Sequence, residues 1–138
     1  MHLNNYLTLG VAGMLLLTLL AACEPAPVEE VPDEPFEPEY GSIETALLED
    51  DLVSFTVLMR GARDATDVQA FGDCAAAQYA VIRGYGFVRH IGTFTDEKDG
   101  LWRGEGVYTI SETVPRGVAT IDANITLAEC REAGIPTV

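Results

Sequence analysis

The sequence predicts an α+β fold for residues 42–138, with two layers, in which one helix packs on a face of an antiparallel sheet in the order ββαβββ. Three observations predict it. Runs of alternating apolar and polar residues indicate strands, one segment has helical periodicity, and turn-forming residues separate these segments. The length allows one small domain with a single hydrophobic core.

The first two strands are expected on either side of the acidic turn at residues 49–51. Segment Leu52–Arg60 alternates apolar and polar side chains, which is typical of a half-buried strand. Segment Ile43–Leu48 fits either a strand or a short helix, and we favour a strand that forms a hairpin with Leu52–Arg60.

The helix is expected to begin near Thr66, because Thr66–Gln69 fits a capping box. Apolar residues then recur at helical spacing from Val68 to Ile82, and Gly84 and Gly86 follow as stop signals. The sequence therefore predicts one amphipathic helix with a broad buried face.

Three further strands are expected at Phe87–Thr95, Leu101–Ser111 and Val118–Glu129. In the second of them, Gly104 and Gly106 fall on the face that points to the core. Glycine at such positions is typical of a bulge or of close approach by a helix.

The N-terminal segment has the composition of an export signal. The apolar run at residues 7–22 is shorter than the roughly 20 residues that a spanning helix needs, but it suits the central part of a secretory signal. The preceding MHLNNY contains no Lys or Arg, which departs from the usual positive start of such signals.

The end of this run, Leu20-Ala21-Ala22-Cys23, resembles a bacterial lipobox. The resemblance implies that residues 1–22 are a signal peptide and that Cys23 receives a diacylglycerol and an acyl chain such as palmitate. Several acyl chains would hold the protein on the inner or outer membrane, facing the periplasm. The alternative is an uncleaved membrane anchor in which the cysteine is incidental.

Residues 23–41 are expected to form a tether, because residues 24–41 contain five prolines and many acids. The whole chain has a net charge of -14, and residues 24–51 contribute eleven acids and no base. Residues 52–138 contain eleven acids and all eight bases. No basic stripe is present, which argues against nucleic-acid binding.

Cys74 and Cys130 remain once Cys23 is lipidated, and an oxidising compartment predicts a disulfide between them. Strict alternation would place Cys130 on the opposite face of its strand from Leu127. The strand must therefore end or bulge near Ala128 for the bridge to form. Separate buried thiols are the alternative.

No catalytic motif, metal-ligand set or cofactor motif is recognised in the sequence. His90 is the single histidine after the predicted signal peptide, and one histidine does not make a zinc site. Arg83, Arg89 and His90 lie close together in the sequence and could form an anion-binding region. Trp102 and Tyr108 are the candidates for an exposed apolar patch of a binding module.

The segments CAAAQYAVIRGYGFVRH, WRGEGVYTIS and GIPTV resemble small alphaproteobacterial envelope lipoproteins of uncharacterised role. The resemblance implies a compact cell-envelope module and assigns no catalytic residue. We therefore expect a non-enzymatic, membrane-tethered lipoprotein that binds or supports another envelope component.

The alternative is a small periplasmic enzyme or enzyme inhibitor that uses the Arg83–His90 region. An enzyme should place His90 in a pocket with a carboxylate within hydrogen-bonding reach. A binding module should instead expose an apolar patch or a free sheet edge.

Overall fold

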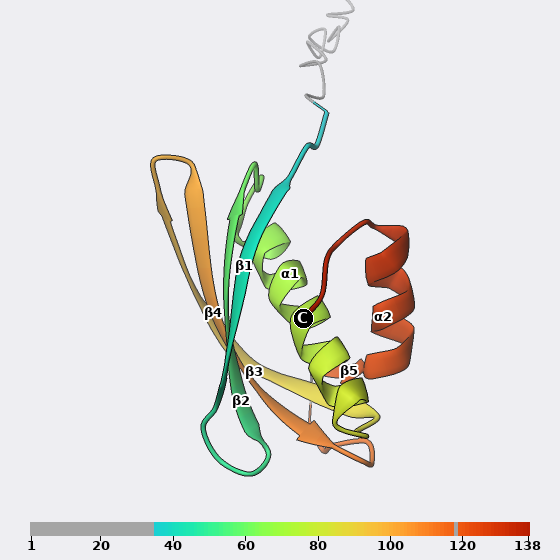
Figure 1. The fold of residues 1–138 in the computed structure, drawn as a ribbon. Coiled ribbons are helices and arrows are strands. Elements are labelled where there is room, and N and C mark those ends of the chain that lie inside the picture. The colour runs from blue at the N-terminus through green and yellow to red at the C-terminus, as the bar shows by residue number, and fades with distance from the viewer. Residues whose placement is uncertain (1–34, 118) are drawn as a thin grey trace, which may run out of the picture. The chain divides into compact units, whose positions relative to one another are not determined.

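The computed structural model describes residues 35–117 and 119–138 (Figure 1). The expected signal peptide, Cys23 and most of the expected tether lie outside these residues. The elements are β1 (Glu39–Leu47), β2 (Leu52–Arg60), α1 (Ala65–Ile82), β3 (Phe87–Lys98), β4 (Leu101–Ser111), β5 (Thr120–Asp122) and α2 (Ala123–Glu132). The described part is therefore an α+β domain.

The five strands form one antiparallel sheet in the order β1-β2-β4-β3-β5. The register shifts between Tyr40 and Ile43 in β1 and between His90 and Gly92 in β3. Strand β5 pairs only with Phe87–Arg89, so most of β3 has β4 as its one neighbour within the described sheet.

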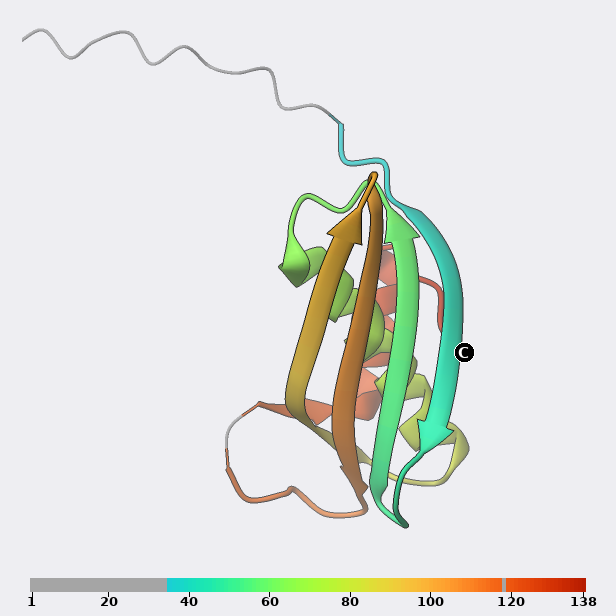
Figure 2. The ribbon, with the colours of Figure 1, turned by 90° about the vertical axis from the view of Figure 1, so that its left-hand side faces the viewer.

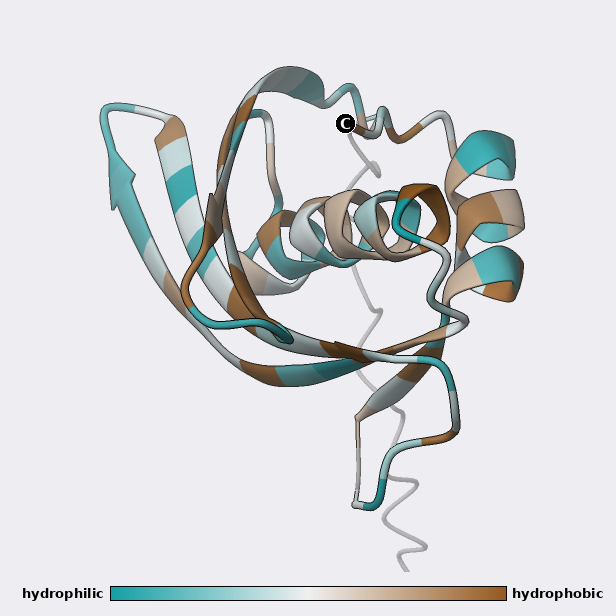
Figure 3. Ribbon diagram, turned by 60° about the horizontal axis from the view of Figure 1, so that its bottom comes forward, coloured by the Kyte–Doolittle hydropathy of each residue, from teal (hydrophilic) through white to brown (hydrophobic). Residues whose placement is uncertain are grey.

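The sheet curls around α1, and α2 lies beside α1 (Figures 1 and 3). The two helices lie on the same side of the sheet, behind the four long strands as Figure 2 shows them. The core fills the space between α1 and the sheet; its largest fully buried side chains are Tyr108, Phe55, Phe71, Met59, Val53, Val57, Val68 and Val88.

The first two strands form the expected hairpin, since β1 pairs antiparallel with β2. Val53, Phe55, Val57 and Met59 of β2 are buried in the core, as the alternation predicts. The ambiguous segment Ile43–Leu48 belongs almost entirely to β1. Strand β1 begins at Glu39, so the folded domain starts inside the range 23–41 that the composition assigns to the tether.

The prediction of a strand over Val118–Glu129 is wrong. Only Thr120–Asp122 is extended, and the chain then forms α2. The Asp122 carboxylate caps this helix by accepting the backbone N–H groups of Asn124 and Ile125, both at 3.1 Å. At its other end, Gly134 has a φ of 70°, and the Ile135 N–H bonds to the Cys130 carbonyl oxygen.

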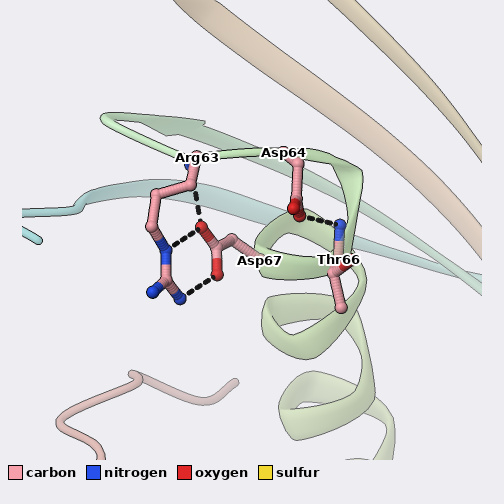
Figure 4. A network of polar contacts seen from close by, with 4 residues as sticks. All are labelled: Arg63, Asp64, Thr66 and Asp67. Carbon is pink, nitrogen blue, oxygen red and sulfur yellow. Dashed lines mark hydrogen bonds and ion pairs between the residues drawn. The ribbon is translucent and has the colours of Figure 1, made fainter. Parts of the chain in front are cut away.

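The predicted capping box at Thr66–Gln69 is also wrong, because Asp64 caps α1 (Figure 4). The Asp64 carboxylate accepts the Thr66 backbone N–H at 2.8 Å. Asp67 instead bonds Arg63 through the Arg63 backbone N–H, Nε and Nη2, at 2.8, 3.0 and 2.7 Å. These bonds from Arg63 hold the pKa of the Asp67 carboxyl below its usual range.

The expected disulfide is confirmed: Cys74 of α1 is bonded to Cys130 of α2. Because this segment is helical, Cys130 shares a buried face with Ala123 and Leu127, at positions i, i+4 and i+7. No strand bulge near Ala128 is needed. The bond fixes the second helix against the first.

We expect replacement of both Cys74 and Cys130 by alanine to lower the free energy of unfolding by about 2–4 kcal/mol, because the closed loop no longer restricts the unfolded chain. Urea unfolding of the full-length chain measures the loss. A reducing agent should destabilise the native protein and leave the double variant unchanged. Equal sensitivity of the two proteins would contradict the assignment.

The close approach of α1 to β4 depends on Gly104. A Cβ atom at this position would lie 2.5 Å from the Val68 Cγ1 atom of α1. The expectation that core-facing glycine in this strand admits a helix is therefore confirmed for Gly104.

We expect Gly104→Ala to lower the free energy of unfolding by about 1–3 kcal/mol, because the added methyl group overpacks the helix–sheet contact. The cost should shrink in a Val68→Ala background. Gly92→Ala is the matched control, since a Cβ there meets nothing within 4 Å. Equal losses for the two glycine variants would contradict the steric explanation.

Candidate functional site

A pocket of about 280 Å³ is bordered by α1, α2, β5 and the C-terminal tail. We call it the interhelical pocket. Its lining comprises Ala70, Asp73, Cys74, Ile121, Thr126, Glu129, Cys130, Ala133 and Ile135. Most of this surface is apolar, and Asp73 and Glu129 are its two ionisable groups.

The C-terminal tail completes the pocket because α2 ends in a tight turn. After Gly134 the chain turns back, and Ile135 packs against the part of the core that contains Val68 and Phe71. Figure 1 shows the tail returning from α2 to α1. The disulfide between the two helices is also part of the lining, so the pocket lies in a covalently fixed frame.

Asp73 lines the pocket and also belongs to a polar cluster in the core, which comprises Asp73, Tyr108, His90 and Thr93. Its carboxylate accepts a hydrogen bond from the Tyr108 hydroxyl at 2.8 Å, and Tyr108 is fully buried. Burial raises the pKa of the Asp73 carboxyl above its usual range, although the bond from Tyr108 and the nearby His90 act in the opposite direction. Burial also raises the pKa of the Tyr108 hydroxyl, and the Asp73 carboxylate raises it further.

His90 belongs to the same cluster but not to the pocket lining. Its Nε2 atom lies 2.7 Å from the Thr93 hydroxyl oxygen, and its ring centroid lies 5.1 Å from that of Tyr108. The Asp73 carboxylate accepts hydrogen bonds from Tyr108 and from the Gln69 side chain, whereas His90 pairs with Thr93. The arrangement is a chain of core polar groups in which Asp73 also faces the pocket.

A family model described as the YNQ4 C-terminal domain matches residues 40–134. The chain belongs to this family. The matched residues of this YNQ4 C-terminal domain run from β1 through α2 and include every pocket residue except Ile135.

One relative is described as an uncharacterised 26.9 kDa protein in the nqo8 5′ region of Paracoccus denitrificans. It is 38% identical over 87 residues, which cover 63% of this chain and 34% of the relative. The match thus spans about a third of that longer protein. No solved structure matches the chain.

In this chain, Arg83, Arg89 and His90 have different neighbours. The Arg83 guanidinium lies at the end of α1, 5.7 Å from the Tyr79 ring centroid. Arg89 and His90 are consecutive in β3 and point to opposite faces of the sheet. The Arg89 guanidinium lies beside Gly117, whereas the His90 ring packs near Tyr108.

Trp102 and Tyr108 do not form the expected exposed patch. Tyr108 is buried, and Trp102 is half-buried against the core around Met59. The large exposed apolar side chains of β3 are Ile91 and Phe94, at 51% and 68% exposure. Trp102 was assigned to an exposed patch on residue type alone. The alternation of β4 already placed Tyr108 on the face that points to the core.

Within residues 35–117 and 119–138, no group of three or more His, Cys, Asp or Glu side chains could hold a metal ion. None of the helices in this part of the chain is long and apolar enough to cross a membrane.

We expect Asp73→Asn to preserve the fold, because the amide oxygen can still accept the Tyr108 hydroxyl. Asp73→Ala should lower the free energy of unfolding by about 1–3 kcal/mol, because it leaves a buried hydroxyl without its acceptor. Urea unfolding at neutral pH measures both effects. The alanine substitution should cost less in a Tyr108→Phe background.

The pH dependence gives a second readout for Asp73. Its carboxyl has a higher pKa in the folded than in the unfolded chain, so ionisation opposes folding at neutral pH and protonation relieves that cost. Asp73→Asn should therefore be at least as stable as the native protein at neutral pH. Its advantage should shrink as the pH falls through the carboxyl range. A growing advantage at acid pH would contradict this sign.

Proposed function

We propose that this protein is a non-enzymatic binding module of the cell envelope, held at a membrane by lipid on Cys23. The observation that carries the binding role is the interhelical pocket, which combines apolar walls with two carboxylates in a disulfide-bonded frame. Concave, largely apolar sites with a few polar groups are the usual form of ligand pockets.

The placement of the ionisable groups favours binding over catalysis. General acid–base chemistry needs two groups that reach the same reacting atoms. Asp73 lines the pocket, but His90 lies outside its lining and pairs with Thr93. The phenol of Tyr108 is buried and donates to Asp73. A ligand in the pocket would therefore meet carboxylates and apolar side chains.

The envelope location is supported by the sequence of the N-terminal segment. Leu20-Ala21-Ala22-Cys23 matches the lipobox pattern and follows an apolar run, and an acidic, proline-rich stretch comes next. Acyl chains at Cys23 would hold the domain on the periplasmic side of the inner or outer membrane. The family also suits a module, since in the Paracoccus relative the matched region is part of a longer chain.

We expect native protein made in a bacterial host to begin at Cys23, to carry the mass of the acyl chains and to sediment with membranes. Cys23→Ser should remove the lipid mass and release the folded domain from the membrane fraction. Intact mass spectrometry and fractionation measure this, with Glu29→Gln in the tether as the control. An unmodified Cys23 that is still joined to Met1 would overturn the anchor.

The binding role is tested on the full-length protein in detergent micelles with three small aliphatic probes: n-butylammonium, n-butanol and butyrate. Amide NMR shifts of Ala70, Ile121 and Ile135 report on the pocket. A saturable shift with any probe supports a binding module. No saturable shift with any of the three would overturn it.

A further inference from the structure

We infer that the interhelical pocket selects an aliphatic primary ammonium group, the chemistry shared by a lysine side chain and a small alkylamine. The carboxylates of Asp73 and Glu129 are its charged contacts. The inference rests on the proposed binding function and names its class of ligand.

The ionisable groups that line the pocket are both acidic. Asp73 lies on α1 and Glu129 on α2, so the two helices each contribute one carboxylate to the lining. The described lining residues include no lysine, arginine or histidine. A cation in the pocket would meet negative charge from two elements, whereas an anion would be repelled by both.

Asp73 accepts hydrogen bonds from two neutral side chains, Tyr108 and Gln69, but has no ion-pair partner among the described residues. The ion pairs of this part of the chain are Arg63–Asp67 and Arg103–Glu105. The Tyr108 hydroxyl is a neutral donor, and His90 interacts with Asp73 only at longer range, since its hydrogen bond goes to Thr93. Partial burial of a carboxylate has a cost when no charge compensates it, and a bound cation would supply that charge.

The rest of the pocket suits a short hydrocarbon chain. Ala70, Ile121 and Ile135 provide apolar contacts for methylene groups, and the volume of about 280 Å³ is at the small end for a ligand pocket. The site therefore fits a charged head on a short aliphatic stem. A metal ion fits poorly, because hard cations take six or more oxygen ligands and much of this lining is hydrocarbon.

The chemistry of Asp73 favours ammonium over guanidinium. A guanidinium binds a carboxylate best through two parallel hydrogen bonds, which use both carboxylate oxygens. The Asp73 carboxylate already accepts hydrogen bonds from Tyr108, at Oδ1, and from the Gln69 side chain. An ammonium group is a compact charge with three donors, and it can add a single hydrogen bond to a carboxylate that already has two donors.

The experiment measures the affinity of the full-length protein for n-butylammonium, n-butanol and butyrate at neutral pH, by the same NMR titration. We expect n-butylammonium to bind most tightly. Asp73→Asn should weaken its binding by roughly tenfold, because a charged hydrogen bond is replaced by a neutral one. Glu129→Gln should weaken it by about two- to threefold, because Glu129 is exposed to solvent.

Two further variants make the result independent of folding. Glu132→Gln removes an exposed carboxylate of α2 that is not in the pocket lining, and it should leave the affinity unchanged. Ala70→Leu keeps every charge but fills the pocket, and it should abolish the binding of all probes. Each variant is accepted only if its amide spectrum matches that of the native protein outside the pocket.

The outcomes separate this inference from the proposed function. If n-butanol or butyrate binds as tightly as n-butylammonium, the preference for ammonium is overturned while the binding module stands. If no probe binds, both fall. A further titration with N-acetyl-lysinamide distinguishes the sources once n-butylammonium has bound. Binding at least as tight as that of n-butylammonium supports a protein side chain, and weaker binding supports a free amine.

Discussion

The packing of α1 against β4 is the contact on which the other features of this domain depend. Gly104 leaves room for Val68 of the helix, and the Tyr108 side chain extends under the helix to Asp73. This contact fixes the depth at which α1 sits in the curled sheet. It thereby sets the positions of Asp73 and Cys74, which in turn determine where α2 can be cross-linked and where the interhelical pocket forms.

Much of the sheet could be predicted from the sequence, because alternation and turn residues agree there. Strand β2 coincides with Leu52–Arg60, and β4 with Leu101–Ser111. The second helix was missed because Ile121, Ala123 and Leu127 fit alternation as well as helical spacing. Two local signals favoured the helix: Asp122 is a good N-cap residue, and Gly134 followed by Pro136 is a typical helix end.

The candidate site was less predictable than the fold, for a physical reason. The pairing of Cys74 with Cys130 was predicted from the cysteine count and the expected oxidising compartment, and the structure confirms the bond. The pocket depends on how two helices lie against each other, which short-range patterns do not encode. Asp73 gave no signal of its own, because a single aspartate in an amphipathic helix is usually solvated. His90 attracted attention by residue type, and the sheet directs it into the polar cluster of the core.

The register shift in β1 affects how this edge of the sheet meets other chains. An edge strand exposes backbone donors and acceptors that can template an incoming strand. The irregularity between Tyr40 and Ile43 interrupts that ladder, so regular pairing positions are continuous only over Ile43–Leu47. Glu44 within this short stretch adds a charge that a stacked copy would have to bury or oppose. An irregular, charged edge of this kind disfavours edge-to-edge pairing between copies of the domain.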